Sequence, residues 1–445
     1  MTGRSTPAAS AAFGEGAPQT NRHRAAPASP ATGLDVDAVR DQFPIFAQPL
    51  DNGRPLTFLD SGASTQKPRC VLDKGREVYE TYYANAYRGV YRFGARVDEE
   101  LEAARDEVRG LLNAERPEEI AFVGGATVAL NMIAFGWGRR NLKPGDRVAV
   151  DLLQHHANLV PWQQVARETG AELVYLPLTD DGRMNLPAAA DLMDERVRLV
   201  AVTGMSNVFG TMPDVAAVSE MARSVGALTV VDGSQSVPHR ATDVRGEGAD
   251  FLVFGGHKLY GPTGIGVLYG RHEVLEQTDP IIFGGHMIDR VGVSESTWAP
   301  PPAKFEAGTL PIVQAIGLGE AVRFVRRIGL DAMAAHEHDL LVRATEQLTS
   351  VPGVRILGPP VEHKGAIVSF TIEGANAQDV AMLLDRRGVF VRHGHHCTMP
   401  LHESMSVPAS IRASFAVYNR PQDVEALIDG LLYARQKLRL DRGDD

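Results

Sequence analysis

Between residues 119 and 270, short apolar runs alternate with stretches in which apolar residues recur at helical spacing. Runs of this kind are typical of strands that are buried on both faces. The predicted strands are residues 119–123, 147–151, 172–177, 198–203, 228–232, 250–254 and 266–269, and the predicted helices are 98–112, 158–169 and 215–225. This alternation predicts an α/β fold, in which helices cover both faces of a mostly parallel sheet.

The pattern changes after about residue 312, where a long helical stretch begins. It is followed by a strand at 366–372, a helix at 377–388, strands at 389–392 and 411–417, and a helix at 421–438. This order predicts a smaller α+β domain. The predicted division is a segment 34–58 packed near the small domain, a large cofactor-binding domain 59–312, a small domain 313–438 and a tail 439–445.

Residues 1–33 have a different composition from the rest of the chain. Ala, Pro, Ser, Thr and Gly occupy 24 of these 33 positions. Such a segment buries too little apolar surface to offset the entropy lost on ordering, so a disordered tail is predicted.

The composition excludes several classes of function. The 445 residues include 45 Lys and Arg against 55 Asp and Glu, a net charge of −10. Without a long basic block, nucleic acid and anionic membranes are poor partners, and no apolar run is long enough to cross a bilayer. The only two cysteines, Cys70 and Cys397, cannot build a disulfide framework, so we expect a reduced, cytoplasmic protein.

Polar residues follow two of the predicted strands, at the sheet edge where ligands bind in open α/β folds. Asp232 closes an apolar run, and Lys258 follows another within a glycine-rich stretch. A lysine in apolar surroundings is costly unless it is paired or used covalently, which makes Lys258 a candidate Schiff-base lysine. Each residue alone has a plainer interpretation, Asp232 as a helix cap and Lys258 as a surface lysine.

Two further patterns raise alternatives. Gly261, Gly264 and Gly266 precede an apolar run instead of opening a helix, so their spacing argues against a dinucleotide site. The pairs His155-His156 and His395-His396 lack partners at metal-ligand spacing, so no metal site is predicted.

One cofactor suits the remaining residues. The turn Gly124-Gly125-Ala126-Thr127 follows a strand and opens a helix, a setting that binds a phosphate monoester. Pyridoxal 5′-phosphate needs such a site, together with a lysine for its aldehyde and an acid for its pyridinium nitrogen. Lys258, Asp232 and a ring-stacking His155 complete a constellation that allows this cofactor.

Five segments, in order along the chain, carry a resemblance to a known family. They are 206–211 (SNVFGT), 231–235 (VDGSQ), 256–264 (GHKLYGPTG), 305–309 (FEAGT) and 392–397 (RHGHHC). They resemble the signatures of SUF-type (group II) cysteine desulfurases, which are pyridoxal-phosphate enzymes of the class V aminotransferase family. The similarity extends over about residues 35–438 and implies the fold-type I architecture of these transferases.

The resemblance implies a role for each matching residue. Lys258 resembles the cofactor-binding, catalytic lysine and Asp232 the partner of the pyridinium nitrogen. The other cofactor contacts that it implies are Gln235 and Asn207 near the ring hydroxyl, His155 stacked on the ring as a possible proton relay, and Ala126, Thr127 and His257 at the phosphate.

The resemblance also implies which residues bind the substrate and which residue reaches the neighbouring subunit. Arg412 and Arg392 match the arginines of the substrate site, with Asn207 nearby, and Cys397 matches the cysteine that takes the sulfur. Thr309 would reach the phosphate of the neighbouring subunit, so the resemblance implies a homodimer with shared active sites.

The sequence departs from the family pattern at several positions. The residues found, with the usual residue in parentheses, are Tyr87 (His), Ala126-Thr127-Val128 (Thr-Thr-Glu), Gln154 (Glu), Gly204 (His), Gly255 (Ser) and Ile282-Phe283 (Glu-Gly). The two hydroxyls lost from the phosphate site are expected to weaken cofactor binding by about 1 kcal/mol each.

The predicted activity is conversion of L-cysteine to L-alanine, with the sulfur held as a persulfide on Cys397. A SUF-type acceptor protein would receive the sulfur for iron–sulfur cluster assembly or other sulfur-containing products. We expect a cationic neighbourhood of Arg392, His395 and His396 to favour the Cys397 thiolate, and a structural role for Cys70. The alternatives are a selenocysteine lyase or another C–S lyase of the family, and a sulfur-transfer scaffold without turnover.

Overall fold

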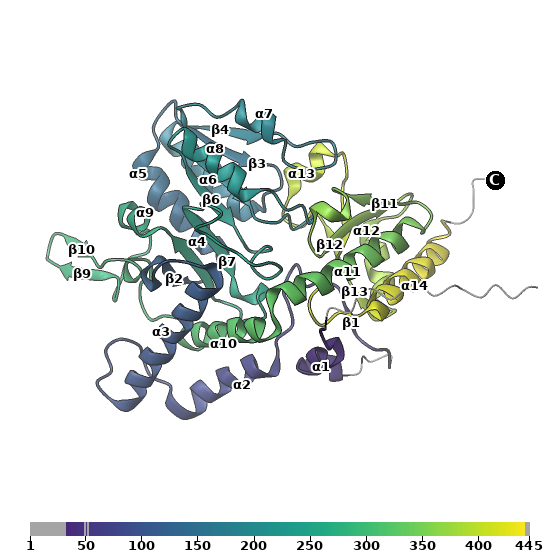
Figure 1. Ribbon diagram of the computed structural model, residues 1–445, viewed down its shortest axis with the longest axis horizontal. Helices are drawn as coiled ribbons and strands as arrows, with labels where there is room; N and C mark the ends of the chain where they lie inside the picture. The colour runs from purple at the N-terminus through teal and green to yellow at the C-terminus, as the bar shows by residue number, and fades with distance from the viewer. Residues whose placement is uncertain (1–32, 49, 51–52, 441–445) are drawn as a thin grey trace, which may run out of the picture. The chain divides into compact units, whose positions relative to one another are not determined.

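The centre of the fold is a seven-stranded sheet with the strand order β2-β8-β7-β6-β5-β3-β4 (Figure 1). The computed structural model describes residues 33–48, 50 and 53–440. The strands are β2 (Ile120–Val123), β3 (Arg147–Asp151), β4 (Glu172–Leu176), β5 (Val197–Thr203), β6 (Leu228–Asp232), β7 (Phe251–Gly255) and β8 (Gly266–Gly270). Only β8 runs against its neighbours, β7 and β2, so the predicted mostly parallel sheet is confirmed.

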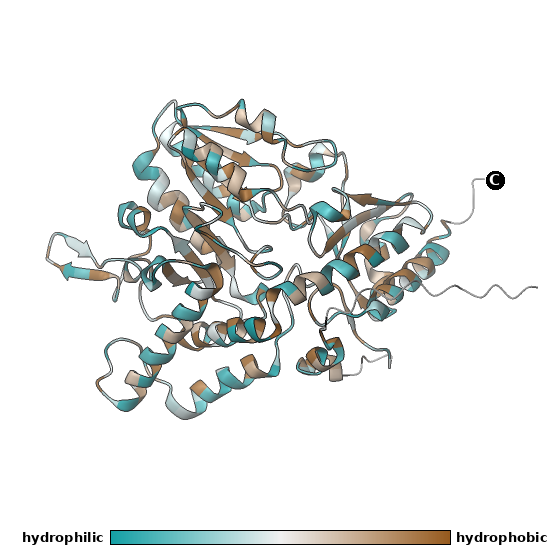
Figure 2. Cartoon of the chain, in the orientation of Figure 1, coloured by the Kyte–Doolittle hydropathy of each residue, from teal (hydrophilic) through white to brown (hydrophobic). Residues whose placement is uncertain are grey.

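Helices cover both faces of this sheet because successive strand residues point to opposite sides. Val231 belongs to one apolar core and its neighbour Val230 to the other. The first core is shared with α3 (Arg92–Leu112), α8 (Val215–Ser224) and α10 (Ile312–Ile328), and the second with α4 (Ala126–Ile133) and α6 (Val160–Thr169). The strands are predominantly apolar, whereas the covering helices are striped (Figure 2). The three-layer α/β prediction is therefore confirmed.

A second, antiparallel sheet has the order β11-β12-β15-β14. Its strands are β11 (Val354–Leu357), β12 (Ile367–Ile372), β15 (Ser410–Ser414) and β14 (Arg392–Gly394), and α11 (Leu330–Thr349), α12 (Ala377–Asp385) and α14 (Pro421–Leu438) share its core. The single strand predicted at 389–392 is wrong. Val389–Phe390 forms β13, which pairs with β1 (Thr57–Phe58), and the chain then changes partner so that β14 pairs with β15.

The N-terminal segment lies beside this second sheet. Helix α1 (Val36–Arg40) ends at Arg40, whose guanidinium donates to the Tyr418 carbonyl and pairs with Asp423 at 3.2 Å. The described residues from 33 to 440 group into one compact unit, so a domain boundary at residue 312 stays a prediction. The tail predictions for residues 1–32 and 441–445 lie outside the described residues.

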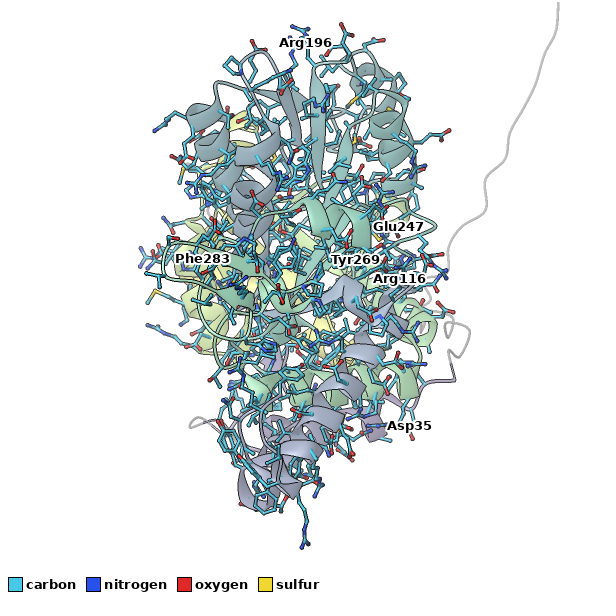
Figure 3. All side chains as sticks on the ribbon, turned by 90° about the vertical axis from the view of Figure 1, so that its left-hand side faces the viewer. Asp35, Arg116, Arg196, Glu247, Tyr269 and Phe283 are labelled. Carbon is cyan, nitrogen blue, oxygen red and sulfur yellow. The ribbon has the colours of Figure 1, made fainter. Side chains whose placement is uncertain are left out.

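The remaining elements are short or lie at the surface. They are α2 (Arg69–Glu77), α5 (Arg139–Asn141), α7 (Leu186–Ala190), α9 (His272–Gln277), α13 (Met399–Ser404) and the hairpin of β9 (Ile288–Val291) and β10 (Ser296–Trp298). Figure 3 shows Phe283, just before this hairpin, on the outside of the molecule. No helix in the described part of the chain combines the length and apolar character needed to cross a membrane.

Candidate active site

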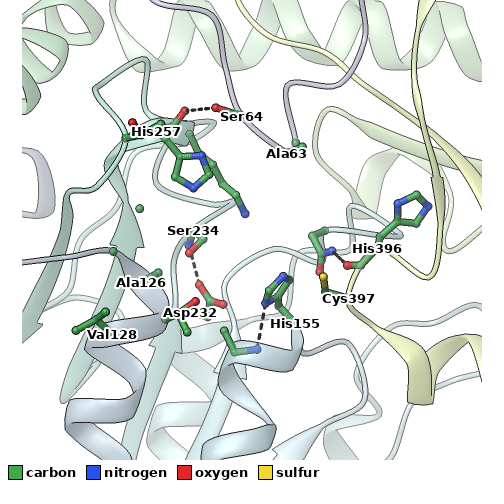
Figure 4. A pocket seen from close by; sticks show the side chains of 18 of the residues that line it. Ala63, Ser64, Ala126, Val128, His155, Asp232, Ser234, His257, His396 and Cys397 are labelled. Atoms are coloured by element: carbon green, nitrogen blue, oxygen red, sulfur yellow. Dashed lines mark hydrogen bonds between the residues drawn. The ribbon is translucent and has the colours of Figure 1, made fainter.

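A cavity of about 610 Å³ lies where the carboxyl ends of the parallel strands face β14 and β15 (Figure 4). Ten of the twelve predicted site residues line it. They are Ala126, Thr127, His155, Asn207, Asp232, His257, Lys258, Arg392, Cys397 and Arg412. The chain therefore brings together residues that lie up to 286 positions apart in the sequence, from Ala126 to Arg412.

Lys258 ends a short 3₁₀ turn, Gly256–Lys258, directly after β7. Burial lowers the pKa of its amine from 10.5 to about 8, although Asp232 opposes the shift. The turn is fixed through the carbonyl oxygen of His257, which accepts from the Thr65 backbone N–H and hydroxyl, both at 3.1 Å, and from the Lys67 ammonium at 2.8 Å. Lys258 is thus a buried amine on a firmly held turn.

Asp232 is the last residue of β6, and its side chain faces the cavity at the end of the sheet. One carboxylate oxygen accepts the Ser234 backbone N–H at 3.0 Å. The residue therefore does cap the following turn, as the plainer interpretation proposed. It also lines the cavity that contains Lys258, so the cap does not exclude a second role.

The turn before α4 forms an anion site. Gly125 has φ of 133°, a conformation that residues with a Cβ rarely adopt, and α4 begins directly after it. The first amides of a helix have no partner within the helix, so here they face the cavity beside the Thr127 side chain. This part of the wall suits a phosphate group.

His155 also lines the cavity. Its Nδ1 accepts the Ala157 backbone N–H at 3.1 Å, which fixes the imidazole at the start of a 3₁₀ turn. Burial lowers the pKa of His155 to about 4, against the attraction of Asp232, so the ring is neutral at physiological pH. Burial likewise lowers the pKa of His257 to about 4.

A buried polar chain behind His155 was not predicted. Asp151, at the end of β3, accepts from the side-chain amide of Gln154 at 2.9 Å, and Gln154 in turn accepts from Asn158 at 2.8 Å. Burial raises the pKa of Asp151 to about 7, although three N–H donors favour its charged form. Gln154 replaces the glutamate that is usual in the family, and a carboxylate is nevertheless present here, because Asp151 accepts from the Gln154 amide.

The two arginines converge on a carboxylate that sequence reasoning missed. Asp60 accepts from Arg412 Nη2 and from Arg392 Nε, both at 3.1 Å. Arg412 also donates from Nη1 to the Asn207 carbonyl at 2.9 Å. Its Nε is buried and has no hydrogen-bond partner among the described residues, so the cavity wall contains one unsatisfied guanidinium donor.

Cys397 lies exposed on a short loop with an unusual backbone. Both His396, with φ of 51°, and Cys397, with φ of 57°, have the left-handed conformation. The loop is held by Asn207, whose amide donates to the His396 carbonyl at 2.7 Å, and by His156, whose backbone N–H donates to the Cys397 carbonyl at 2.8 Å. The thiol is thereby presented to the cavity by a restrained loop.

The predicted cationic role of His396 is wrong. The residue is buried, its Nε2 lies 3.1 Å from the Ser410 hydroxyl, and burial beside Arg412 lowers its pKa to about 2. A buried imidazole next to a guanidinium stays neutral because a second positive charge there would be neither solvated nor paired.

The comparisons with known proteins agree with this geometry. The family model described as aminotransferase class-V matches residues 57–427. The chain belongs to this family. It is 44% identical over 403 residues to a probable cysteine desulfurase of Halobacterium salinarum, covering 91% of this chain and 97% of that protein. A probable cysteine desulfurase of Streptomyces coelicolor is 43% identical over 407 residues, covering 90% of this chain and 97% of that protein.

Solved structures give the same result for the fold. A cysteine desulfurase of Escherichia coli superposes with a TM-score of 0.84 at 35% identity, covering 91% of this chain and 99% of that one. The cysteine desulfurase of Thermococcus onnurineus also reaches 0.84 at 35% identity, covering 88% and 96%. The fold-type I prediction is confirmed.

Class-V aminotransferase family members depend on pyridoxal 5′-phosphate. The residues present fit this group. The cavity combines a buried amine at Lys258, a carboxylate at Asp232, a flat neutral ring at His155 and the amides that begin α4. Among the described residues, no three His, Cys, Asp or Glu side chains are grouped to hold a metal ion.

Two predicted residues lie outside the cavity of this family member. The Gln235 amide is buried and donates to the Gly62 carbonyl at 2.6 Å, so it supports the wall at Gly62. Thr309 lines a second, smaller cavity together with Tyr87 and His286. Both roles stay predictions.

Two departures from the family pattern have a structural counterpart. A Cβ on Gly204 would clash with the Ser236 hydroxyl, so Ser236 occupies the space that a larger residue at 204 would need. Tyr87 stacks on His286 with ring centroids 4.6 Å apart, and its hydroxyl donates to Glu102 at 2.8 Å. The sequence alone could not predict these surroundings, because Ser236 and His286 lie far along the chain from Gly204 and Tyr87.

Proposed function

We propose that the protein is a cysteine desulfurase that converts L-cysteine to L-alanine and holds the released sulfur on Cys397. The observation that carries this proposal is that one cavity contains both the buried amine of Lys258 and the exposed thiol of Cys397. The first suits proton transfer and the second suits sulfur transfer. The relatives named as cysteine desulfurases support it.

Lys258 would bind pyridoxal 5′-phosphate and later move a proton at its Nζ. When bound, the cofactor supplies an electron sink that makes the substrate Cα acidic. A pKa of about 8 leaves an appreciable fraction of the Lys258 amine unprotonated near neutral pH, which a proton acceptor requires. Asp232 would hold the ring nitrogen, His155 would lie on the ring, and Ala126, Thr127 and His257 would hold the phosphate.

Arg412 would orient the substrate. Its unsatisfied buried Nε is a donor that a carboxylate can accept, and a guanidinium binds carboxylates in a fixed geometry. The thiolate of Cys397 would then attack the substrate sulfur and break its bond to Cβ, whose electron pair stays with the carbon. That carbon takes up a proton to give alanine, and the sulfur stays on Cys397 as a persulfide. The restrained loop keeps this nucleophile on the cavity wall.

The test is to incubate the purified holoenzyme with L-cysteine and a reductant and to measure alanine and sulfide. We expect equal amounts of the two products. L-selenocysteine serves as the comparison substrate, and a kcat/KM that is far higher for it would replace the proposal with a selenocysteine lyase. No alanine from either substrate would contradict both enzymatic interpretations.

We also propose a homodimer in which Thr309 completes the partner's phosphate site. Thr309 follows Glu306, which is anchored by a buried pair with Arg105 at 2.7 Å. Large apolar side chains near this loop are exposed, among them Val90, Tyr91 and Phe283. A second copy of the chain would cover them and bring Thr309 to its site.

The destination of the sulfur is a further part of the proposal. An exposed persulfide on Cys397 can be reached by the thiol of an acceptor protein of the SUF type, which would supply iron–sulfur cluster assembly. A free thiolate at Cys397 requires reducing conditions, which the cytoplasm provides.

A further inference from the structure

Asp60 is the common partner of the two arginines in the cavity. The register of β14 and β15 places Arg392 directly opposite Arg412 on adjacent strands. Asp60 bridges Ser414, two residues beyond Arg412, and its carboxylate lies 3.1 Å from both guanidinium groups. The three charged side chains therefore form one connected cluster.

The charges of this cluster have a definite balance. Like charges directly opposite on neighbouring strands repel each other, and Arg412 is buried with 3% of its side chain exposed. One carboxylate between two guanidinium groups leaves a net charge of one positive unit. Without Asp60, the same wall would carry two positive units and would attract ligands with two negative charges.

The hydrogen bonds of Arg412 and Arg392 also favour a ligand with a single negative charge. Asp60 and the Asn207 carbonyl occupy Nη2 and Nη1 of Arg412, while its Nε stays unpaired among the described residues. Asp60 also accepts from the Nε of Arg392, so this carboxylate partly neutralises the second arginine of the cavity wall. The buried Nε of Arg412 is thus, among the described residues, a free donor for one ligand carboxylate.

We infer that Asp60 is a specificity-determining residue that restricts the cavity to amino acids with a single carboxylate. This inference rests on the proposed function, since it names the class of substrate that the same cavity accepts. Asp60 lowers the affinity for dicarboxylic amino acids by neutralising one of the two arginines that would otherwise bind them. A side chain such as that of cysteine carries no second carboxylate and is unaffected.

The test compares two ligands that have no sulfur to transfer. Dissociation constants of L-alanine and L-aspartate are measured on the holoenzyme by calorimetry and by the visible absorbance of the bound cofactor. In Asp60→Asn, the ratio of the aspartate constant to the alanine constant should fall by at least about tenfold. In Asp60→Asn/Arg392→Gln, which restores a net single positive charge, the ratio should return toward the wild-type value.

A matched control exists at the amino ends of β3 and β5, outside the cavity. Asp194 also bridges two arginines, Arg147 and Arg196, at 3.2 and 2.6 Å. Asp194→Asn makes the same charge change away from the cavity and should leave the ratio unchanged. An Asp60→Asn ratio within twofold of wild type, or a double variant equal to the single one, would overturn the inference.

Two provisions keep the outcomes separable. If Asp60→Asn loses the cofactor, Arg392→Gln alone takes its place, because it reduces the cluster to zero net charge. The ratio of the aspartate constant to the alanine constant should then rise above that of the wild type. An unchanged ratio in this variant contradicts the inference. Binding constants do not depend on turnover, so a protein that makes no alanine from cysteine would refute the proposed function while the ratio still decides the role of Asp60.

Discussion

The Nε2 atom of His156 accepts a hydrogen bond from the Met399 backbone N–H at 3.0 Å. The same residue donates its own backbone N–H to the Cys397 carbonyl. One histidine beside the seven-stranded sheet therefore holds both sides of the loop that presents the thiol. Burial lowers the pKa of His156 below its usual value, so the neutral ring that can accept this bond persists at neutral pH.

His156→Ala should slow sulfur transfer to Cys397 by about tenfold, which corresponds to the loss of one hydrogen bond. Binding of L-alanine should stay near the wild-type value, because that step uses Arg412 and Lys258. Single-turnover persulfide formation and alanine titration measure the two effects separately. His338→Ala, an exposed histidine on α11, is the matched control and should alter neither. Equal losses in both measurements would indicate a general disturbance of the site.

The low pKa of Lys258 predicts a pH dependence for cofactor capture. Only the unprotonated amine reacts with an aldehyde, and its fraction rises as the pH passes through about 8 instead of the usual 10.5. The rate at which the apoprotein binds pyridoxal 5′-phosphate covalently should therefore increase up to about pH 8 to 9 and then level off. Stopped-flow absorbance between pH 6 and 10.5 measures this profile.

Borohydride reduction followed by mass spectrometry should place the cofactor on Lys258. Lys258→Ala should show no adduct, whereas Lys67→Ala, which removes a half-buried lysine nearby, should keep it. A reducible adduct retained in Lys258→Ala would refute the assignment of this lysine.

Cys397→Ser should keep the bound cofactor and the affinity for L-alanine but lose desulfurase turnover by at least about a thousandfold. A hydroxyl has too high a pKa to replace a thiolate as the nucleophile. Alkylation of the wild type after cysteine addition, followed by peptide mapping, should find one extra sulfur on Cys397. Cys70→Ser is the control and should behave as wild type. Extra sulfur on Cys70 would contradict the proposed mechanism.

Mixing two impaired variants tests the shared site. Lys258→Ala lacks the amine, and Thr309→Ala lacks the hydroxyl that would serve the partner. In a mixed dimer, one site has its own Lys258 together with the Thr309 of the other subunit, so subunit exchange should restore cofactor affinity and activity at that site. Each variant alone gives the baseline. Mixtures that regain nothing, in a protein shown to be dimeric by ultracentrifugation, would assign Thr309 to its own subunit or to no site.

Sequence reasoning found the residues that follow strands. Asp232 and Lys258 could be located because apolar runs of strand length end directly before them, and the parallel sheet brings such ends to one edge. The same logic found the turn before α4. These inferences needed only local patterns and the general topology of α/β folds.

The residues that were missed depend on contacts between distant segments. Asp60 meets Arg392 across 332 positions, and His156 meets Met399 across 243. No periodicity indicates which aspartate lies between two arginines. The charge of His396 was misjudged for a related reason, because its burial against Ser410 and Arg412 is a property of the folded packing.

The segment that follows β1 connects the two sides of the cavity. Its Leu59 N–H is bonded to the Phe390 carbonyl beside the antiparallel sheet, and its Thr65 N–H is bonded to the His257 carbonyl next to Lys258. Seven residues pinned at both ends thus join the part of the protein that carries Arg412 to the part that carries the amine. Any movement that separates Arg412 from Lys258 would therefore have to strain or break one of these two bonds, so the segment limits how far the two ends of the cavity can move apart.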